Sequence, residues 1–116
     1  MQYMLLIYHP EGTELAYGTP EFGAMMEGYR DFTNAVMGAG KMKSGDPLEP
    51  VSTATTVRVR NGNTETTDGP FAETKEQLGG FYILDCENLD EAIEYAKKIP
   101  TAAWGSIEIR PVMIFD

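Results

Sequence analysis

The chain has 116 residues, of which 42% are hydrophobic and 23% charged, so its length and composition predict one globular domain over residues 1–116. Its 18 acidic and 9 basic side chains give a net charge of −9. This charge argues against direct nucleic-acid binding through a broad basic surface and against adhesion to anionic membranes, because those partners are themselves negatively charged.

The first elements expected along the chain are a strand and a helix. Residues 2–9 are apolar on both faces, which predicts a central strand. Thr19 is placed to cap a helix whose first residue is Pro20, and Gly38 and Gly40 end it. The apolar residues that recur at helical spacing are Phe22, Met25, Met26, Tyr29, Phe32, Val36 and Met37.

A β-hairpin is the clearest feature of the middle of the chain. After a short strand expected at 41–45, residues 55–60 alternate between valine and polar side chains. The pair Asn61-Gly62 is the strongest hairpin-turn signal in the sequence and leads into a return strand over 63–67.

The last third of the chain predicts a strand, a helix and a final strand. The strand covers residues 81–86, and Asn88 then caps a helix that stops before Pro100. Residues 107–115 alternate and form the last strand, with Pro111 at an edge or bulge.

This order predicts an α+β fold of the ferredoxin-like type, with two helices on one face of an antiparallel sheet. The other face of the sheet needs cover, because the first and last strands are apolar on both sides. We therefore expect a homodimer packed sheet to sheet.

The segment 68–80, DGPFAETKEQLGG, carries the main functional signal. Asp68 cannot make the usual Asx-turn, because the residue two positions on is Pro70, which has no N–H. Gly79 and Gly80 permit close approach by a ligand or by another chain. The structural alternative is a rigid turn with Phe71 in the core and the charges in solvent.

The segment resembles the signature of the DGPF branch of the YCII-related family. The resemblance extends to YMLLIY at the start, ATTVRVRNG at 54–62, LDEAIEYAKKIP in the second helix and GSIEIRPV at 105–112. It implies a ferredoxin-like fold that dimerises into a barrel-like assembly, with a cleft regarded as an active site. It also implies an association with extracytoplasmic-function sigma factors.

One position departs from the related YCII branch, which carries a histidine on the first helix eleven residues before a glycine. Here Tyr29 stands eleven residues before Gly40. A phenol, with an ordinary pKa of about 10, is a poor base at neutral pH but can donate a hydrogen bond to an oxyanion. Histidine chemistry at that position is therefore not carried over to this chain.

The candidate catalytic residues are Asp68 as base or anchor, Tyr29, and His9, which holds the only imidazole of the chain and ends the first strand. The structural alternatives are a surface position for His9 and core packing for Tyr29. The candidate ligand-binding residues are Phe71, Glu73, Lys75 and Arg58. Arg58 has a structural alternative in Glu65, which lies opposite it in the hairpin.

Two functions fit these residues. One is a small-molecule-binding protein or a cofactor-independent enzyme of the proton-transfer or isomerisation type. The other is a regulatory or interaction module that contacts a sigma factor. One cysteine and one histidine cannot build a Cys/His zinc site, and no nucleotide motif is present, so no cofactor is expected. The single Cys86 excludes an internal disulfide, and cytoplasmic residence is expected.

Overall fold

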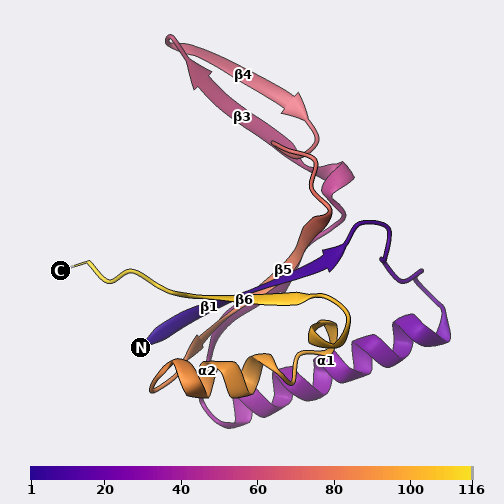
Figure 1. Cartoon of the computed structure of the whole chain (residues 1–116), viewed down its shortest axis with the longest axis vertical. Helices are drawn as coiled ribbons and strands as arrows, with labels where there is room; N and C mark the ends of the chain where they lie inside the picture. Colours follow the sequence, from indigo (N-terminus) through magenta and orange to yellow (C-terminus); the bar gives the residue numbers. More distant parts are fainter. Residues whose placement is uncertain (116) are drawn as a thin grey trace.

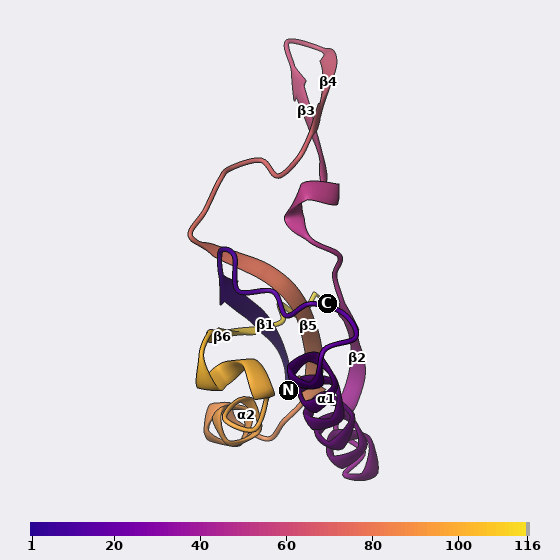
Figure 2. The ribbon, with the colours of Figure 1, turned by 90° about the vertical axis from the view of Figure 1, so that its right-hand side faces the viewer.

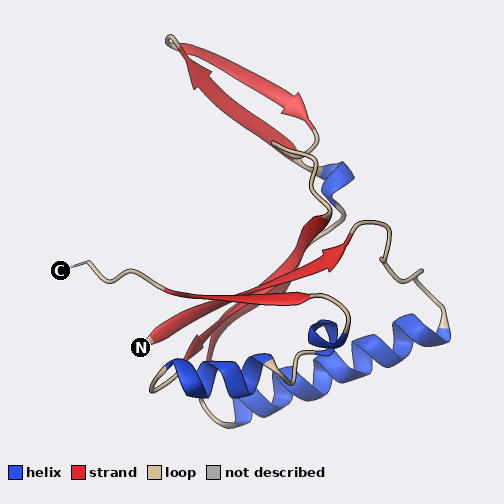
Figure 3. Ribbon diagram, viewed as in Figure 1, coloured by secondary structure: helices blue, strands red, loops and turns tan. Residues whose placement is uncertain are grey.

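The computed structural model describes residues 1–115 as one α+β domain with a projecting hairpin (Figure 3). Its helices and strands, in chain order, are β1 (Gln2–Pro10), α1 (Pro20–Gly38), β2 (Met42–Pro47), β3 (Thr55–Arg60), β4 (Asn63–Asp68), β5 (Glu76–Asp85), α2 (Leu89–Ala96) and β6 (Ser106–Pro111). Two short 3-10 turns complete the list, η1 (Val51–Thr53) and η2 (Pro100–Ala103).

The main sheet has four strands in the order β2-β5-β1-β6, and every neighbouring pair is antiparallel. The predicted central position of β1 is confirmed, because β1 pairs with β5 on one side and β6 on the other. Both helices lie on one face of this sheet (Figures 1 and 2). This is the predicted ferredoxin-like arrangement, and the helices leave the opposite face of the sheet uncovered.

The core forms where β1 meets the helices. Tyr3, Leu5 and Ile7 alternate along β1 and are buried toward the helical side, with Leu5 fully buried. Phe32 and Val36 of α1 pack against them one helical turn apart. The rest of the buried cluster comprises Tyr82, Leu84, Cys86, Ala92, Ala96 and Ile99.

Both helices begin where the capping residues predict. The Thr19 hydroxyl accepts a hydrogen bond from the amide of Phe22 (3.2 Å), and the Asn88 side chain accepts one from the amide of Glu91 (2.9 Å). Helix α2 ends at Ala96, before Pro100. Within residues 1–115, no helix is long and apolar enough to cross a membrane.

Strands β3 and β4 form a separate two-stranded hairpin, Thr55–Asp68, which we call the arm. Its turn has φ values of 53° at Asn61 and 80° at Gly62, which are the left-handed conformations that an Asn-Gly hairpin turn requires. The predicted register is confirmed, with Arg58 opposite Glu65. The arm projects from the sheet on the side away from the helices (Figures 1 and 2).

Two predicted strand boundaries need correction. Strand β5 begins at Glu76 and not at residue 81, because Pro10 and His9 of the long β1 pair with Glu76 and Gln77. The last strand ends at Pro111 and not at residue 115, because Pro111 lies opposite Tyr3 and β1 has almost no residues left to pair beyond it.

Candidate functional site

The predicted site segment begins at the root of the arm, where its backbone is fixed by the hairpin. Asp68 is exposed and lies opposite Thr55. The Gly69 amide donates to the Ala54 carbonyl (2.6 Å), and the Thr56 hydroxyl donates to the Gly69 carbonyl (2.8 Å). Gly69 has a φ of 108°, which a residue with a Cβ rarely adopts. These bonds extend the pairing of the hairpin by one residue beyond Asp68, whose side chain is left exposed to solvent.

Arg58 and Phe71 are brought together at this root. The Arg58 guanidinium donates to the Phe71 carbonyl (3.3 Å), and no ion pair joins it to Glu65 in the part of the chain that is described. The Phe71 ring is 75% exposed, so the alternative that placed it in the core is wrong. The backbone of this bend is therefore held by hydrogen bonds, whereas the Phe71 ring is exposed to solvent.

The remainder of the segment carries the chain from the arm to the end of the main sheet. Glu73 and Lys75 are exposed, and the Lys75 carbonyl accepts a hydrogen bond from the Glu11 amide (2.7 Å) just after β1. Two residues later, Gln77 lies opposite His9. Lys75 thus reaches the same end of the sheet as His9, whereas none of the described hydrogen bonds joins Asp68 to His9 or to Tyr29.

The predicted close approach at the two glycines is made by the chain itself. The strand pairing shifts by one residue at Gly79, which forms a β-bulge opposite Ile7 and Tyr8. A Cβ on Gly79 would stand 2.9 Å from His9 Cδ2 and 3.2 Å from His9 Nε2. At Gly80, a Cβ would stand 3.1 Å from the Asp46 carbonyl oxygen. The bulge therefore gives the imidazole room to lie over the backbone of β5.

A contact at the end of β1 fixes the tautomer of the neutral His9 ring. Its Nδ1 lies 3.2 Å from the Pro10 carbonyl oxygen. A carbonyl can only accept, so this contact requires the proton on Nδ1 and leaves Nε2 as the basic nitrogen of the neutral ring. The Trp104 ring lies beside the imidazole, with 6.4 Å between centroids, and is 40% exposed. A partly exposed base and an exposed aromatic surface thus stand together.

Turn η2 connects this pair to Tyr29. The Tyr29 hydroxyl lies 2.6 Å from the hydroxyl of Thr101, which is buried, and Trp104 follows one turn later. Burial is the main cause that raises the Tyr29 pKa above its usual value. Tyr29 therefore stays protonated and is a hydrogen-bond donor or acceptor, not a base, as its chemistry predicts.

Changing Tyr29 to phenylalanine tests how much this contact stabilises the fold. We expect Tyr29→Phe to lower the free energy of unfolding by about 1–2 kcal/mol, because the buried Thr101 hydroxyl loses its partner. The matched control is Tyr17→Phe, since Tyr17 is 91% exposed and should change stability by less than about 0.5 kcal/mol. Urea denaturation measures both, and equal losses in the two variants would contradict a stabilising Tyr29–Thr101 bond.

Two residues of this group, Thr101 and Trp104, were not predicted from the sequence. Both lie after the second predicted helix, in a stretch with no periodicity that would have placed it. The available signal was composition, because Trp104 is the only tryptophan and lies beside a glycine that leads into the last strand.

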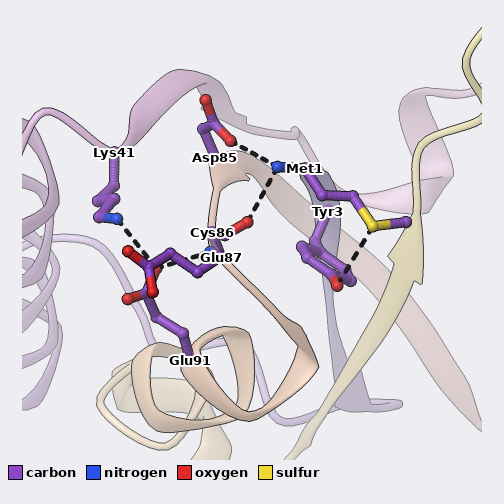
Figure 4. A network of polar contacts seen from close by, with 7 residues as sticks. All are labelled: Met1, Tyr3, Lys41, Asp85, Cys86, Glu87 and Glu91. Atoms are coloured by element: carbon purple, nitrogen blue, oxygen red, sulfur yellow. Dashed lines mark hydrogen bonds and ion pairs between the residues drawn. The ribbon is translucent and has the colours of Figure 1, made fainter.

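A second polar network lies at the opposite end of β1 (Figure 4). The amine of Met1 lies 2.9 Å from the Asp85 carboxylate, and Lys41 lies 3.1 Å from Glu91. Hydrogen bonding from the Met1 amine lowers the Asp85 pKa, and the Lys41 ammonium lowers the Glu91 pKa. Burial raises the pKa of the Cys86 thiol, which keeps it protonated. A surface hollow of about 300 Å³ borders this network. The charged groups of the network are already paired with one another.

Comparison with known proteins gives a family and a fold. The family model described as the YCII-related domain matches residues 1–116. An uncharacterized protein of Rhizobium meliloti (strain 1021) is 38% identical over 117 residues, covering 99% of this chain and 94% of that protein. A solved structure of 5-chloro-2-hydroxyhydroquinone dehydrochlorinase (TftG) from Burkholderia phenoliruptrix AC1100, in complex with 2,5-dihydroxybenzoquinone, matches with a TM-score of 0.52. It is 14% identical, and the match covers 97% of this chain and 94% of that chain, so this likeness shows the fold.

Proposed function

The chain belongs to the YCII-related family, and from that premise we propose that it binds a small molecule and catalyses a cofactor-independent proton transfer beside His9. The observation that carries the proposal is the hydrogen bond from His9 Nδ1 to the Pro10 carbonyl, which leaves the basic Nε2 beside the exposed ring of Trp104. Membership of the DGPF branch, which rests on residues 68–80, is part of the same proposal.

The chemistry proposed for the site is simple. His9 Nε2 removes a proton from a hydroxyl or an acidic C–H of the ligand, and the same nitrogen returns it after the bonds rearrange. Trp104 provides a flat apolar surface against which a planar ligand stacks. Tyr29 acts as a positioning residue, because its bond to Thr101 fixes the turn that carries Trp104. Lys75, at the same end of the sheet, supplies a cation for an oxyanion.

The proposed ligand class is a planar ring that carries hydroxyl or carbonyl oxygens. The dehydrochlorinase of the same fold is described in complex with such a molecule, 2,5-dihydroxybenzoquinone. In this chain, the His9–Trp104 pair offers the two contacts that this class needs, an aromatic face and a proton acceptor. Asp68 and Glu73 are proposed as outer contacts, reached from the root of the arm.

Fluorescence of Trp104 gives a direct test, because it is the only tryptophan. We expect 2,5-dihydroxybenzoquinone or hydroquinone to quench this emission saturably, and His9→Ala to weaken the apparent affinity at least about tenfold. The control is Tyr17→Phe, an exposed position whose change should leave the affinity as in wild type. Quenching that never saturates, or is the same in His9→Ala, would remove the support for a His9 site.

Asp68→Asn tests whether the proposed ligand site extends from His9 at the end of β1 to the root of the arm. The Asp68 carboxylate is exposed, so its neutralisation should leave the melting temperature nearly unchanged. A weaker affinity in this variant would extend the site to the arm root. An unchanged affinity would restrict the site to the end of β1 and leave Asp68 as a turn residue.

The chain is also proposed to act as a homodimer packed through the uncovered face of its sheet. Met4, Leu6 and Tyr8 alternate with the core residues of β1 and face that side, where they remain half-buried. Phe81 and Ile83 of β5 lie opposite Leu6 and Met4 and extend the same apolar surface. An apolar sheet face of this kind is normally covered in a stable protein.

The second proposed function is an interaction module for a sigma factor, as the DGPF resemblance implies. The net charge of −9 favours a basic partner. Purification from the native cell at low and moderate salt is the test. Recovery of the homodimer alone at both salt concentrations would count against a stable sigma-factor complex.

A further inference from the structure

The arm receives little support from its own domain. Strands β3 and β4 pair with each other and, within the described chain, with no strand of the main sheet. Every residue of β4 is exposed, and Val57 and Val59 are each 60% exposed. A two-stranded hairpin alone is at best marginally stable in water, so an arm of defined structure needs a surface to pack on.

The arm has one apolar face that could supply such a contact. Val57 and Val59 point to the same side of β3, and their partners across the hairpin are Thr66 and Thr64. These four β-branched side chains form a continuous face on one side of the arm. Phe71, at the arm root, adds an aromatic ring that is 75% exposed.

The chain exposes more surface than a compact monomer of its size. A compact monomer of 12.8 kDa would expose about 6,300 Å², and the chain exposes 8045 Å². Its radius of gyration is 16.1 Å, whereas a compact domain of this length has about 13.4 Å. The excess of roughly 1,800 Å² is about twice the 800 Å² that each partner buries in a standard interface.

The arm and the uncovered sheet face lie on the same side of the molecule. The helices cover one face of the sheet, and the arm projects away on the other side (Figures 1 and 2). A body that seats on the uncovered face is therefore next to the arm. This position favours a partner that contacts both surfaces at once.

The charge of the arm suits a second copy of the same acidic chain. Its four charged residues, Arg58, Arg60, Glu65 and Asp68, cancel, so the whole net charge of −9 resides outside the arm. The arm is therefore the segment that an acidic copy repels least, although its two arginines lie on the face opposite Val57 and Val59.

We propose that the arm is a clasp that closes over a second copy of this chain seated on the uncovered sheet face. The apolar face of the arm and Phe71 become buried against that copy, and the two arms act symmetrically. The inference rests on the proposed sheet dimer but goes beyond it, because a sheet dimer could form without the arms.

Adding two lysines to one face of the arm or to the other distinguishes a dimer that is held by the arms from a sheet dimer that forms without them. Val57→Lys with Val59→Lys places two charges on the apolar face, and Asn63→Lys with Thr67→Lys places the same charges on the other face. Sedimentation equilibrium should show a roughly 100-fold higher dimer Kd for the valine variant and at most about a threefold change for its control. Phe71→Ala should raise the Kd about tenfold. Circular dichroism checks that each variant is folded.

Three other results of these measurements would overturn the clasp. Equal Kd values for wild type and the valine variant would overturn the clasp and leave the sheet dimer standing. A wild-type chain that stays monomeric at about 100 μM, well above the Kd of a stable complex, would overturn both. Equal weakening by the two lysine pairs would also overturn the clasp, because it would indicate a general charge effect and not contact through one face.

Discussion

Gly105→Ala should lower the free energy of unfolding by about 2–4 kcal/mol, because the structure has no space for the new methyl group. A Cβ at this position would collide with the carbonyl oxygen of Tyr8 and stand 2.8 Å from the Thr101 methyl group. The first neighbour is backbone, so rotation of a side chain cannot relieve the clash. Turn η2 must shift away from β1, and Trp104 must shift with it.

Two measurements on Gly105→Ala follow from this displacement. Urea denaturation reports the stability loss, and the Trp104 emission should move to longer wavelength as the ring leaves His9. The matched control is Gly23→Ala in α1, where a Cβ meets nothing within 4 Å and should stabilise the helix by about 0.5–1 kcal/mol. Similar stabilities for the two variants would refute the steric role assigned to Gly105.

Neighbouring leucines of β1 should respond differently to truncation. Leu5 is fully buried against the helices, so Leu5→Ala should cost about 2–5 kcal/mol at any protein concentration. Leu6 lies on the uncovered face. Leu6→Ala should cost little in the separate chain and should mainly weaken the proposed dimer, so its effect should grow with protein concentration.

Thermal unfolding at two concentrations about 100-fold apart tests the leucine pair. The midpoint of Leu5→Ala should fall by the same amount at both concentrations, relative to wild type. The midpoint of Leu6→Ala should fall more at the higher concentration, because that concentration favours the proposed wild-type dimer. A concentration-independent loss in Leu6→Ala would argue that the sheet face is exposed to solvent in the working protein.

Local signals in the sequence predicted much of the fold. Thr19 and Asn88 cap helices through side-chain hydrogen bonds, and Asn61-Gly62 sets both the hairpin and its register. These features depend on residues close in the chain, so periodicity and capping rules reach them. Non-local features were harder to predict. The early start of β5 depends on partners supplied by Pro10 and His9, more than 65 positions away.

In the candidate site too, features set by neighbouring residues were predicted and features set by distant residues were not. Asp68 and Phe71 were singled out from a local motif, and the backbone of this motif is held by hydrogen bonds of Gly69 and Phe71 across the hairpin to Ala54, Thr56 and Arg58. The grouping of His9 with Trp104 depends on a strand end and a 3-10 turn distant in the sequence, which no spacing rule joins. The bulge at Gly79 that seats the imidazole was visible only as a pair of glycines.

The central place of β1 has a consequence for synthesis of the protein. Strand β1 precedes both of its partners in the sequence, because it pairs with β5 and β6, and Tyr3 lies opposite Pro111. The apolar β1 therefore has no strand partner until β5 has been synthesised, and it gains its second partner only with β6. The sheet is therefore completed by contacts between residues far apart in the sequence, which form slowly, and the apolar β1 stays exposed until they form.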